Sequence, residues 1–173
     1  MKIKAMKKSE NILHCFEPVI DQNTKVMIIG TMPGEASLVA NEYYAYKHNA
    51  LWKIMARLYN SDRKFADYGE KLSCLRENGI GLWDNLHSCE RSGSLDSDIK
   101  NAEPNDFETL CIRYPALKRF LFNGQQSYKF FKKFHPALLE KYEYYILPST
   151  SPANASISFD EKLKHWKEAL FQA

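Results

Sequence analysis

The chain has 173 residues, a length that fits one domain and leaves little room for a second. Its hydrophobic content of 45% is ordinary for a globular protein, and a formal net charge of +3 does not by itself indicate a nucleic-acid partner. No run of eighteen apolar residues and no apolar segment near the first residue occurs, so the sequence predicts no membrane span and no secretory signal, and we expect a cytoplasmic monomer.

The first half of the chain is predicted to hold two strands and two helices. Residues 1–10 are polar and basic, and we expect them to form a flexible arm. A short apolar run then closes on Gly30, which is typical of a buried strand, and a Pro-Gly pair ends it. The elements expected here are a strand at 25–30, a helix at 50–59, a helix at 68–77 and a strand at 81–86.

The second half opens with a long polar stretch, residues 87–105, which we expect to be a surface loop. Asn105 is expected to cap the helix after it, and Ser156 and Ser158 are equally good caps for the last helix. The elements expected here are a helix at 106–113, a strand at 118–122, a helix at 125–135, a strand at 144–147 and a helix at 160–171.

Strands separated by helices indicate a parallel sheet that is covered on both faces. In such sheets the functional site lies where the strands end at their carboxyl edge. Three segments leave predicted strands with small or polar residues, and they are 30–34, 123–124 and 148–155. We therefore expect these three segments to converge.

Two of these segments resemble motifs of the uracil-DNA glycosylase superfamily. The first comprises Gly30-Thr31-Met32-Pro33-Gly34, then Tyr43-Tyr44, then Asn49-Ala50-Leu51-Trp52. It resembles the superfamily's first motif, in which a Gly-x-x-Pro-Gly loop leads to an aromatic residue and then to an Asn that opens a helix. The second, Pro148-Ser149-Thr150-Ser151-Pro152-Ala153-Asn154-Ala155, resembles the motif that follows the last strand.

Within that superfamily, the middle of the chain is similar to the hypoxanthine-DNA glycosylase family, also called the DNA-deoxyinosine glycosylase family. The similar segments are 81–84, 89–91, 93–96 and 101–107, and the whole resemblance covers residues 25–160. It implies an α/β fold built as a three-layer αβα sandwich around a central, mostly parallel four-stranded sheet. It also implies one DNA glycosylase domain over residues 1–173 that needs no cofactor and no metal.

The residue type at position 32 differs between branches of the superfamily. Several branches place a catalytic Asn or Asp between the Gly and the Pro of the first motif, where this chain has Met32. The hypoxanthine family is similar in lacking that residue and relies on an Asn after the aromatic residue, which matches Asn49. An amide can position a water but cannot act as a strong base, so catalysis would depend on positioning and electrostatics. Spacing alone favours Asn49 as a helix N-cap, and both roles can hold together.

The other expected base-binding residues come from the same loops. The resemblance implies that Asn123 holds the base, because one amide can pair with O6 and N1–H of hypoxanthine, although a turn residue would look the same. Tyr44 is expected to stack on the flipped base and Tyr43 is a poorer candidate, while core packing is an equally good interpretation of each. The remaining expected base-binding residues are Gly30, Thr31, Met32, Pro33 and Gly34.

The segment after the last strand is expected to bind DNA, with a plain polar loop as the alternative. Its first part supplies hydroxyl and N–H groups for phosphate oxygens, from Ser149, Thr150 and Ser151. Its second part is expected to form a wedge toward the minor groove, from Pro152, Ala153 and Asn154.

Other residues that could bind a metal or take part in catalysis are assigned no role. The five His and four Cys residues are scattered without metal spacing, so we expect no metal site. Asp84, Glu90 and Asp96 could act as general bases, but they lie in or near the polar stretch, where surface charge is the commoner explanation.

The favoured hypothesis is a monofunctional glycosylase of base excision repair that removes hypoxanthine from DNA and leaves an abasic site for a downstream endonuclease. No Lys occupies a matched motif position where it could form a Schiff base. A uracil-specific or mismatch-specific glycosylase on the same fold and a non-catalytic DNA-lesion binding protein remain as alternatives. A nucleotide-binding module is disfavoured, because the Gly30–Gly34 turn lacks the Lys and Ser/Thr of a P-loop.

Overall fold

The computed structural model describes residues 12–172, so the expected arm at residues 1–10 lies outside the described residues. The elements are β1 (Ile12–His14), β2 (Val26–Gly30), α1 (Glu35–Ala40), α2 (Leu51–Tyr59), α3 (Tyr68–Glu77), β3 (Ile80–Asp84), β4 (Leu86–Glu90), the 3₁₀ turn η1 (Asp96–Asp98), β5 (Lys100–Pro104), α4 (Phe107–Arg113), β6 (Arg119–Asn123), α5 (Gln125–Phe134), α6 (Pro136–Leu139), β7 (Glu143–Leu147) and α7 (Phe159–Phe171). Every element predicted from the sequence is present, with bounds shifted by at most one or two residues.

Four strands form the expected parallel sheet, in the order β3-β2-β6-β7. Strand β2 lies in its interior and is buried on both faces, which explains why residues 26–30 are apolar without alternation. The register pairs Gly30 with Asp84 and Asn123 with Leu147 at the last positions of their strands. The carboxyl ends of all four strands therefore lie along one edge.

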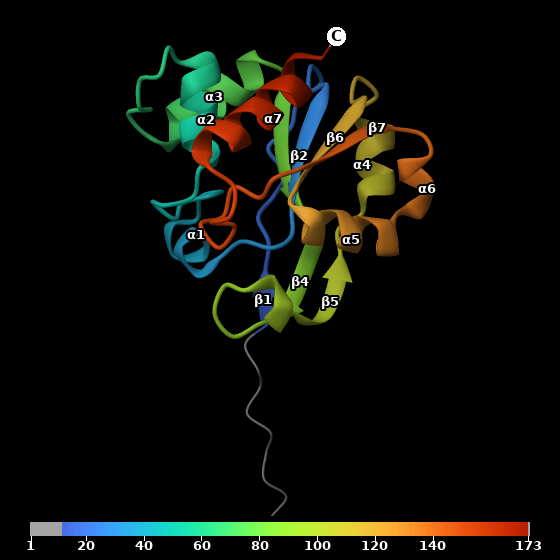
Figure 1. Ribbon diagram of the computed structural model, residues 1–173. Coiled ribbons are helices and arrows are strands. Elements are labelled where there is room, and N and C mark those ends of the chain that lie inside the picture. Colours follow the sequence, from blue (N-terminus) through green and yellow to red (C-terminus); the bar gives the residue numbers. More distant parts are fainter. Residues whose placement is uncertain (1–11, 173) are drawn as a thin grey trace, which may run out of the picture.

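Helices cover both faces of this sheet and complete the predicted αβα sandwich (Figure 1). On one face α2, α3 and α7 pack against Ile28 and Leu121, with the fully buried Trp166 among them. On the other face α4, α5 and α6 pack against Ile29 and Phe122. Neighbouring residues of one strand thus face opposite layers, as the pleat requires.

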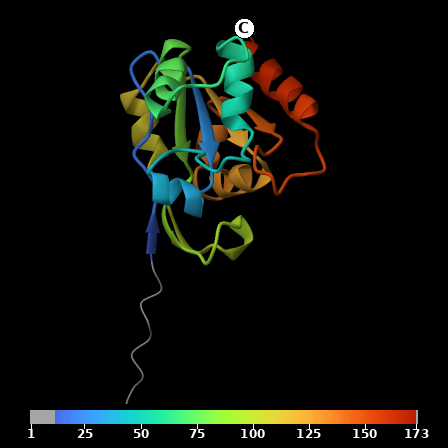
Figure 2. The ribbon, with the colours of Figure 1, turned by 90° about the vertical axis from the view of Figure 1, so that its left-hand side faces the viewer.

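The polar stretch at residues 87–105 is not simply a loop, and this prediction was wrong. It contains most of β4 and all of β5, which join β1 in a three-stranded antiparallel sheet of order β1-β4-β5. In Figures 1 and 2 this small sheet lies beyond the carboxyl edge of the central sheet. Only a small apolar cluster around Met32, Leu86 and Cys89 lies beneath it, so its strands carry too few apolar residues to be recognised by pattern.

The chain bends sharply between β3 and β4, which corrects the predicted strand at 81–86. Asn85 is buried at the bend, and its amide donates to the carbonyls of Gly30 and Ser127. Asn105, expected as a helix cap, is also buried, and its amide donates to the Asp84 carbonyl. Asp106 caps α4 instead, accepting from the Thr109 N–H. Both asparagines therefore hold the end of β3 in place.

The last helix, α7, begins at Ser158, which decides between the two expected caps. The Ser158 hydroxyl accepts from the Glu161 N–H, while the Glu161 carboxylate accepts from the Ser158 N–H. With 13 residues α7 is the longest helix of the described chain, and none of the helices between residues 12 and 172 is long and apolar enough to cross a membrane.

Candidate active site

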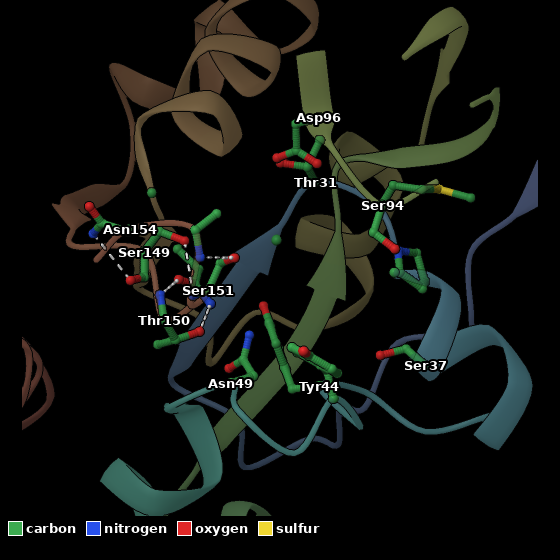
Figure 3. A pocket seen from close by; sticks show the side chains of 18 of the residues that line it. Thr31, Ser37, Tyr44, Asn49, Ser94, Asp96, Ser149, Thr150, Ser151 and Asn154 are labelled. Atoms are coloured by element: carbon green, nitrogen blue, oxygen red, sulfur yellow. Dashed lines mark hydrogen bonds between the residues drawn. The ribbon is translucent and has the colours of Figure 1, made fainter. Parts of the chain in front are cut away.

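A pocket of about 930 Å³ opens at the carboxyl edge of the central sheet (Figure 3). The three loops that leave β2, β6 and β7 converge there, as expected, and the segment before α2 joins them. The expected site residues that line it are Gly30, Thr31, Met32, Pro33, Gly34, Tyr44, Asn49, Asn123, Ser149, Thr150, Ser151, Pro152, Ala153 and Asn154. The structure thus brings every expected site residue to one cavity.

Gly30 lies at a point where two polar side chains approach the backbone closely. A Cβ atom at this position would lie 2.3 Å from Asp84 Oδ1 and 2.9 Å from the Tyr44 hydroxyl. Real Cβ atoms are not found that close to other heavy atoms, so a larger residue would displace both groups. The first glycine of the loop is therefore explained by close approach.

Asn49 caps a helix turn and also faces the pocket, which is compatible with the two roles that the sequence left open. Its Oδ1 accepts from the Leu51 N–H at 3.0 Å, so it caps the first turn of α2 by side chain even though Ala50 holds the formal cap position. Because that N–H can only donate, the amide oxygen must face it, and the NH₂ group points into the pocket on the side of the Tyr44 hydroxyl (Figure 3). The oxygen retains a second lone pair for a water.

Asn123 is held in a fixed orientation by Thr150. Asn123 Oδ1 accepts from the Thr150 N–H at 2.9 Å, and Asn123 Nδ2 donates to Thr150 Oγ1 at 2.9 Å. This pair leaves one amide N–H and one lone pair of Asn123 for a ligand. The Thr150 carbonyl also accepts from the Ala50 N–H, so one backbone segment links Asn123 to the start of α2 beside Asn49.

The two neighbouring tyrosines have different surroundings. Tyr43 is 4% exposed, packs in the core and donates to the Glu17 carbonyl, which agrees with the core-packing interpretation. Tyr44 lines the pocket with a positive φ of 54°, a conformation that aromatic residues rarely adopt. Burial raises the pKa of its hydroxyl and the nearby Asn123 amide lowers it, but no hydrogen bond of normal geometry reaches this hydroxyl among residues 12–172. The fold therefore places the Tyr44 hydroxyl in the cavity wall close to Asn123.

The loop after β7 supports itself largely through its own hydroxyls. Ser149 Oγ accepts from the Ser151 N–H, and Ser151 Oγ accepts from the Ala153 N–H. Pro152 and Ala153 are exposed at the tip, where a wedge toward DNA would lie. Thr150 is only 1% exposed and contacts Asn123, so its side chain is placed to position that residue rather than to meet a phosphate.

The sequence analysis missed the role of one acidic residue, Asp84, as part of the pocket wall. Its side chain is 4% exposed rather than at the surface, and its Oδ2 atom has no hydrogen-bond partner within residues 12–172. Burial is the main cause that raises the pKa of this carboxyl to about 7, the nearby Asp96 raises it too, and Arg91 opposes the shift. Asp84 follows an apolar run at the end of a strand, as the other site segments do, and this position was the feature of the sequence that could have identified it as a site residue.

A second acid, Asp96 of η1, lines the same pocket beside Thr31 (Figure 3). Burial raises the pKa of its carboxyl, and the Thr31 hydroxyl lowers it. The remaining acid considered from the sequence, Glu90, does not line the cavity. Across residues 12–172, no three His, Cys, Asp or Glu side chains are grouped so that they could hold a metal ion.

Comparison with known proteins places the chain in a family. A family model described as the uracil DNA glycosylase superfamily matches residues 17–173. The chain is 37% identical over 156 residues to a hypoxanthine DNA glycosylase of Methanosarcina barkeri, covering 90% of this chain and 96% of the relative. It is 34% identical over 158 residues to a hypoxanthine DNA glycosylase of Methanosarcina acetivorans, covering 91% and 96% respectively.

The fold comparison agrees with the sequence comparison. A solution NMR structure from Methanosarcina acetivorans, of a protein proposed to be a uracil DNA glycosylase, matches with a TM-score of 0.78 at 32% identity. The match covers 92% of this chain and 97% of that chain.

Proposed function

This chain belongs to the uracil-DNA glycosylase superfamily, and from that membership we propose that it is a monofunctional hypoxanthine-DNA glycosylase that hydrolyses the N-glycosidic bond of deoxyinosine in DNA. The observation that carries the proposal is the convergence of Asn49, Asn123 and Tyr44 in one cavity. Two relatives named hypoxanthine DNA glycosylase, each matched over 96% of its length, support the choice of base.

The reaction requires the damaged nucleotide to leave the helix and enter the pocket. Asn49 faces that space with its NH₂ group and one free lone pair, which suits it to hold a water near C1′. The sugar becomes cationic as the bond to the base breaks, so a weakly activated water is a sufficient nucleophile. Of the described residues that line the pocket none is a lysine, so no amine is placed to form a Schiff base and cut the strand.

Hypoxanthine is favoured over uracil by the residue at position 32, and the size of the cavity is compatible with a purine. Met32 lines the pocket where other branches of the superfamily have an Asn or Asp, so that route to an activated water is missing. The cavity of about 930 Å³ also has room for a purine. A uracil-specific enzyme remains the second candidate, because the similar solved structure was proposed to act on uracil.

The direct test is excision from end-labelled duplexes that carry one deoxyinosine, one deoxyuridine or one deoxyxanthosine, with alkali to reveal abasic sites. We expect strand breaks after alkali at deoxyinosine and none before it. Cleavage at deoxyuridine alone would move the chain to the uracil-specific candidate, and silence on all three substrates would overturn the proposal.

The product and the partners follow from the same chemistry. An abasic site would require a downstream endonuclease that cuts the sugar-phosphate backbone. As further parts of the proposal, the enzyme works as a monomer and in the cytoplasm, where it meets DNA with a deaminated base.

Removing the Asn123 side chain should damage base recognition more than general DNA affinity. The Asn123→Ala variant should lose about 100-fold in excision rate, because it removes the amide that faces the base. Affinity for undamaged duplex should stay within about twofold, because backbone contacts dominate it. The two quantities are measured by single-turnover excision and by fluorescence anisotropy.

Thr150→Val is the matched control for this variant. It keeps the backbone N–H that orients Asn123 Oδ1 and removes only the hydroxyl acceptor. We expect an excision rate within about tenfold of the wild type, since one neutral hydrogen bond contributes about 1 kcal/mol. Equal losses of excision and of general affinity in Asn123→Ala would indicate misfolding and contradict the assigned role.

A further inference from the structure

The proposed mechanism assigns no acidic hydrogen-bond donor to the departing base, although the pocket contains a carboxyl group whose Oδ2 atom has no hydrogen-bond partner among residues 12–172. Asp84 is the last residue of β3 and pairs in register with Gly30, at the end of the first motif's strand. Its carboxyl lies directly over Gly30 together with the Tyr44 hydroxyl. Both groups line the cavity, and Asp84 Oδ2 and the Tyr44 oxygen have no protein partner among residues 12–172.

No side chain among residues 12–172 forms an ion pair with Asp84. Arg91, after β4, lowers the pKa of Asp84 by its charge, but its Nε and Nη2 atoms donate to the backbone carbonyls of Gly93 and Pro33, and the effect of burial is larger. The other titratable groups that act on Asp84 or feel its charge are Asp96 of η1, Tyr43 and Tyr44 before α2, and Cys15 after β1. Asp96 raises the pKa of the Asp84 carboxyl, whereas the two tyrosines and the cysteine have raised pKa values themselves and are neutral near pH 7. A buried carboxyl in such surroundings favours its neutral form.

A neutral carboxyl is a hydrogen-bond donor, whereas a carboxylate only accepts. When the C1′–N9 bond breaks, its electron pair goes to the base, and negative charge develops on the purine. A carboxylate beside that charge would oppose the reaction, while a donor would stabilise it. Hypoxanthine presents O6 and N7 as acceptors, so it offers atoms that such a donor can reach.

From this placement we infer that Asp84 in its protonated form is a catalytic hydrogen-bond donor to O6 or N7 of the departing base. The C1′–N9 electron pair leaves with the base, whose negative charge the Asp84 O–H stabilises, and the base then takes a proton from solvent to become neutral hypoxanthine. The water held by Asn49 forms the new C1′–O bond, and the proton that it releases goes to solvent. The sum is deoxyinosine plus water giving an abasic site plus hypoxanthine. This inference rests on the proposed function.

The inference predicts a specific dependence on pH. The wild-type rate of single-turnover excision from a deoxyinosine duplex should be constant below about pH 7 and fall by about tenfold per pH unit above it, because the carboxyl has a pKa of about 7. Asp84→Asn keeps a donor of the same shape that does not titrate. It should remain within about tenfold of the wild type at pH 6 and show no fall between pH 7 and 9.

Two further variants make the test specific. Asp84→Ala removes the donor and should lose at least about 100-fold at pH 6, with an unchanged circular-dichroism spectrum to show that it folds. Asp98→Asn, an exposed acid outside the pocket in the same 3₁₀ turn as Asp96, should behave as the wild type at every pH.

Several results would overturn the inference about Asp84. A wild-type rate that rises through pH 7, or an Asp84→Asn variant as inactive as Asp84→Ala, would mean that the carboxylate is the working form and would overturn the inference. A rate that is equal in all variants would assign Asp84 no catalytic part. If the wild type fails to excise hypoxanthine at any pH while folded, the proposed function fails first, and the inference falls with it.

Discussion

Asn49→Ala should reduce the single-turnover rate of hypoxanthine excision by at least about 100-fold, because it removes the only amide placed to hold a water beside the sugar in the proposed mechanism. The same substitution removes the hydrogen bond to the Leu51 N–H at the start of α2. We therefore also expect a loss of about 1 kcal/mol in the free energy of unfolding. Excision is measured on a deoxyinosine duplex, and stability by denaturant unfolding.

Asn49→Ser separates these two effects. Serine can accept from the same N–H two residues on, more weakly than asparagine, so the Leu51 N–H keeps an acceptor and the free energy of unfolding should recover part of the loss. The shorter side chain cannot reach into the pocket as an amide does, so excision should remain low. A serine variant with wild-type activity would show that Asn49 matters only as a cap.

Asp84→Asn should stabilise the protein at alkaline pH and have little effect in acid. The pKa of this carboxyl rises from its usual 3.8 to about 7 on folding, so the folded state binds more protons than the unfolded state between these values. The free energy of unfolding of the wild type therefore falls as pH rises from about 4 to about 7. Above about pH 7 the stability lost through ionisation of Asp84 stays constant. Asparagine cannot ionise, so the variant should gain up to about 4 kcal/mol at pH 8.

Thermal unfolding at pH 4.5 and pH 8 measures this effect independently of any activity. Asp98→Asn is again the matched control, because this acid is exposed and should change stability little at either pH. Equal stability of Asp84→Asn and the wild type at pH 8 would mean that the folded protein tolerates the Asp84 carboxylate at no cost. That result would also remove the physical basis for Asp84 as a neutral hydrogen-bond donor.

The amino-acid sequence was sufficient to predict the four strands of the central sheet and five of the helices around it, but not the short helices α1 and α6. Strands β2, β3, β6 and β7 are short apolar runs that end in Gly, Asp, Asn or a Pro-containing segment, and these signals are local. The carboxyl-edge rule then predicted that the loops after β2, β6 and β7 meet, and they line one pocket. The resemblance to glycosylase motifs supplied Asn49 and Asn123 within those loops.

The small sheet was beyond the reach of sequence patterns. Its strand β1 pairs with β4, so Ile12 lies opposite Glu90 across most of the first half of the chain. The strands pack on only a small apolar cluster, and their residues are therefore mostly polar. Pairing over such a sequence distance depends on where the central sheet places both segments, which no local pattern records.

The sequence by itself thus determined the four strands of the central sheet, five of the helices and three of the loops that form the site, because apolar runs and chain-breaking residues act within a few positions. Only the tertiary structure decided what the polar side chains do. Asp84 ends an apolar strand and Thr150 lies in a polar segment, and neither position reveals that the fold buries the first beside Gly30 and sets the second against Asn123. The reason is physical, since the burial of a polar group, and with it its protonation and hydrogen bonding, is set by neighbours that are distant in the chain.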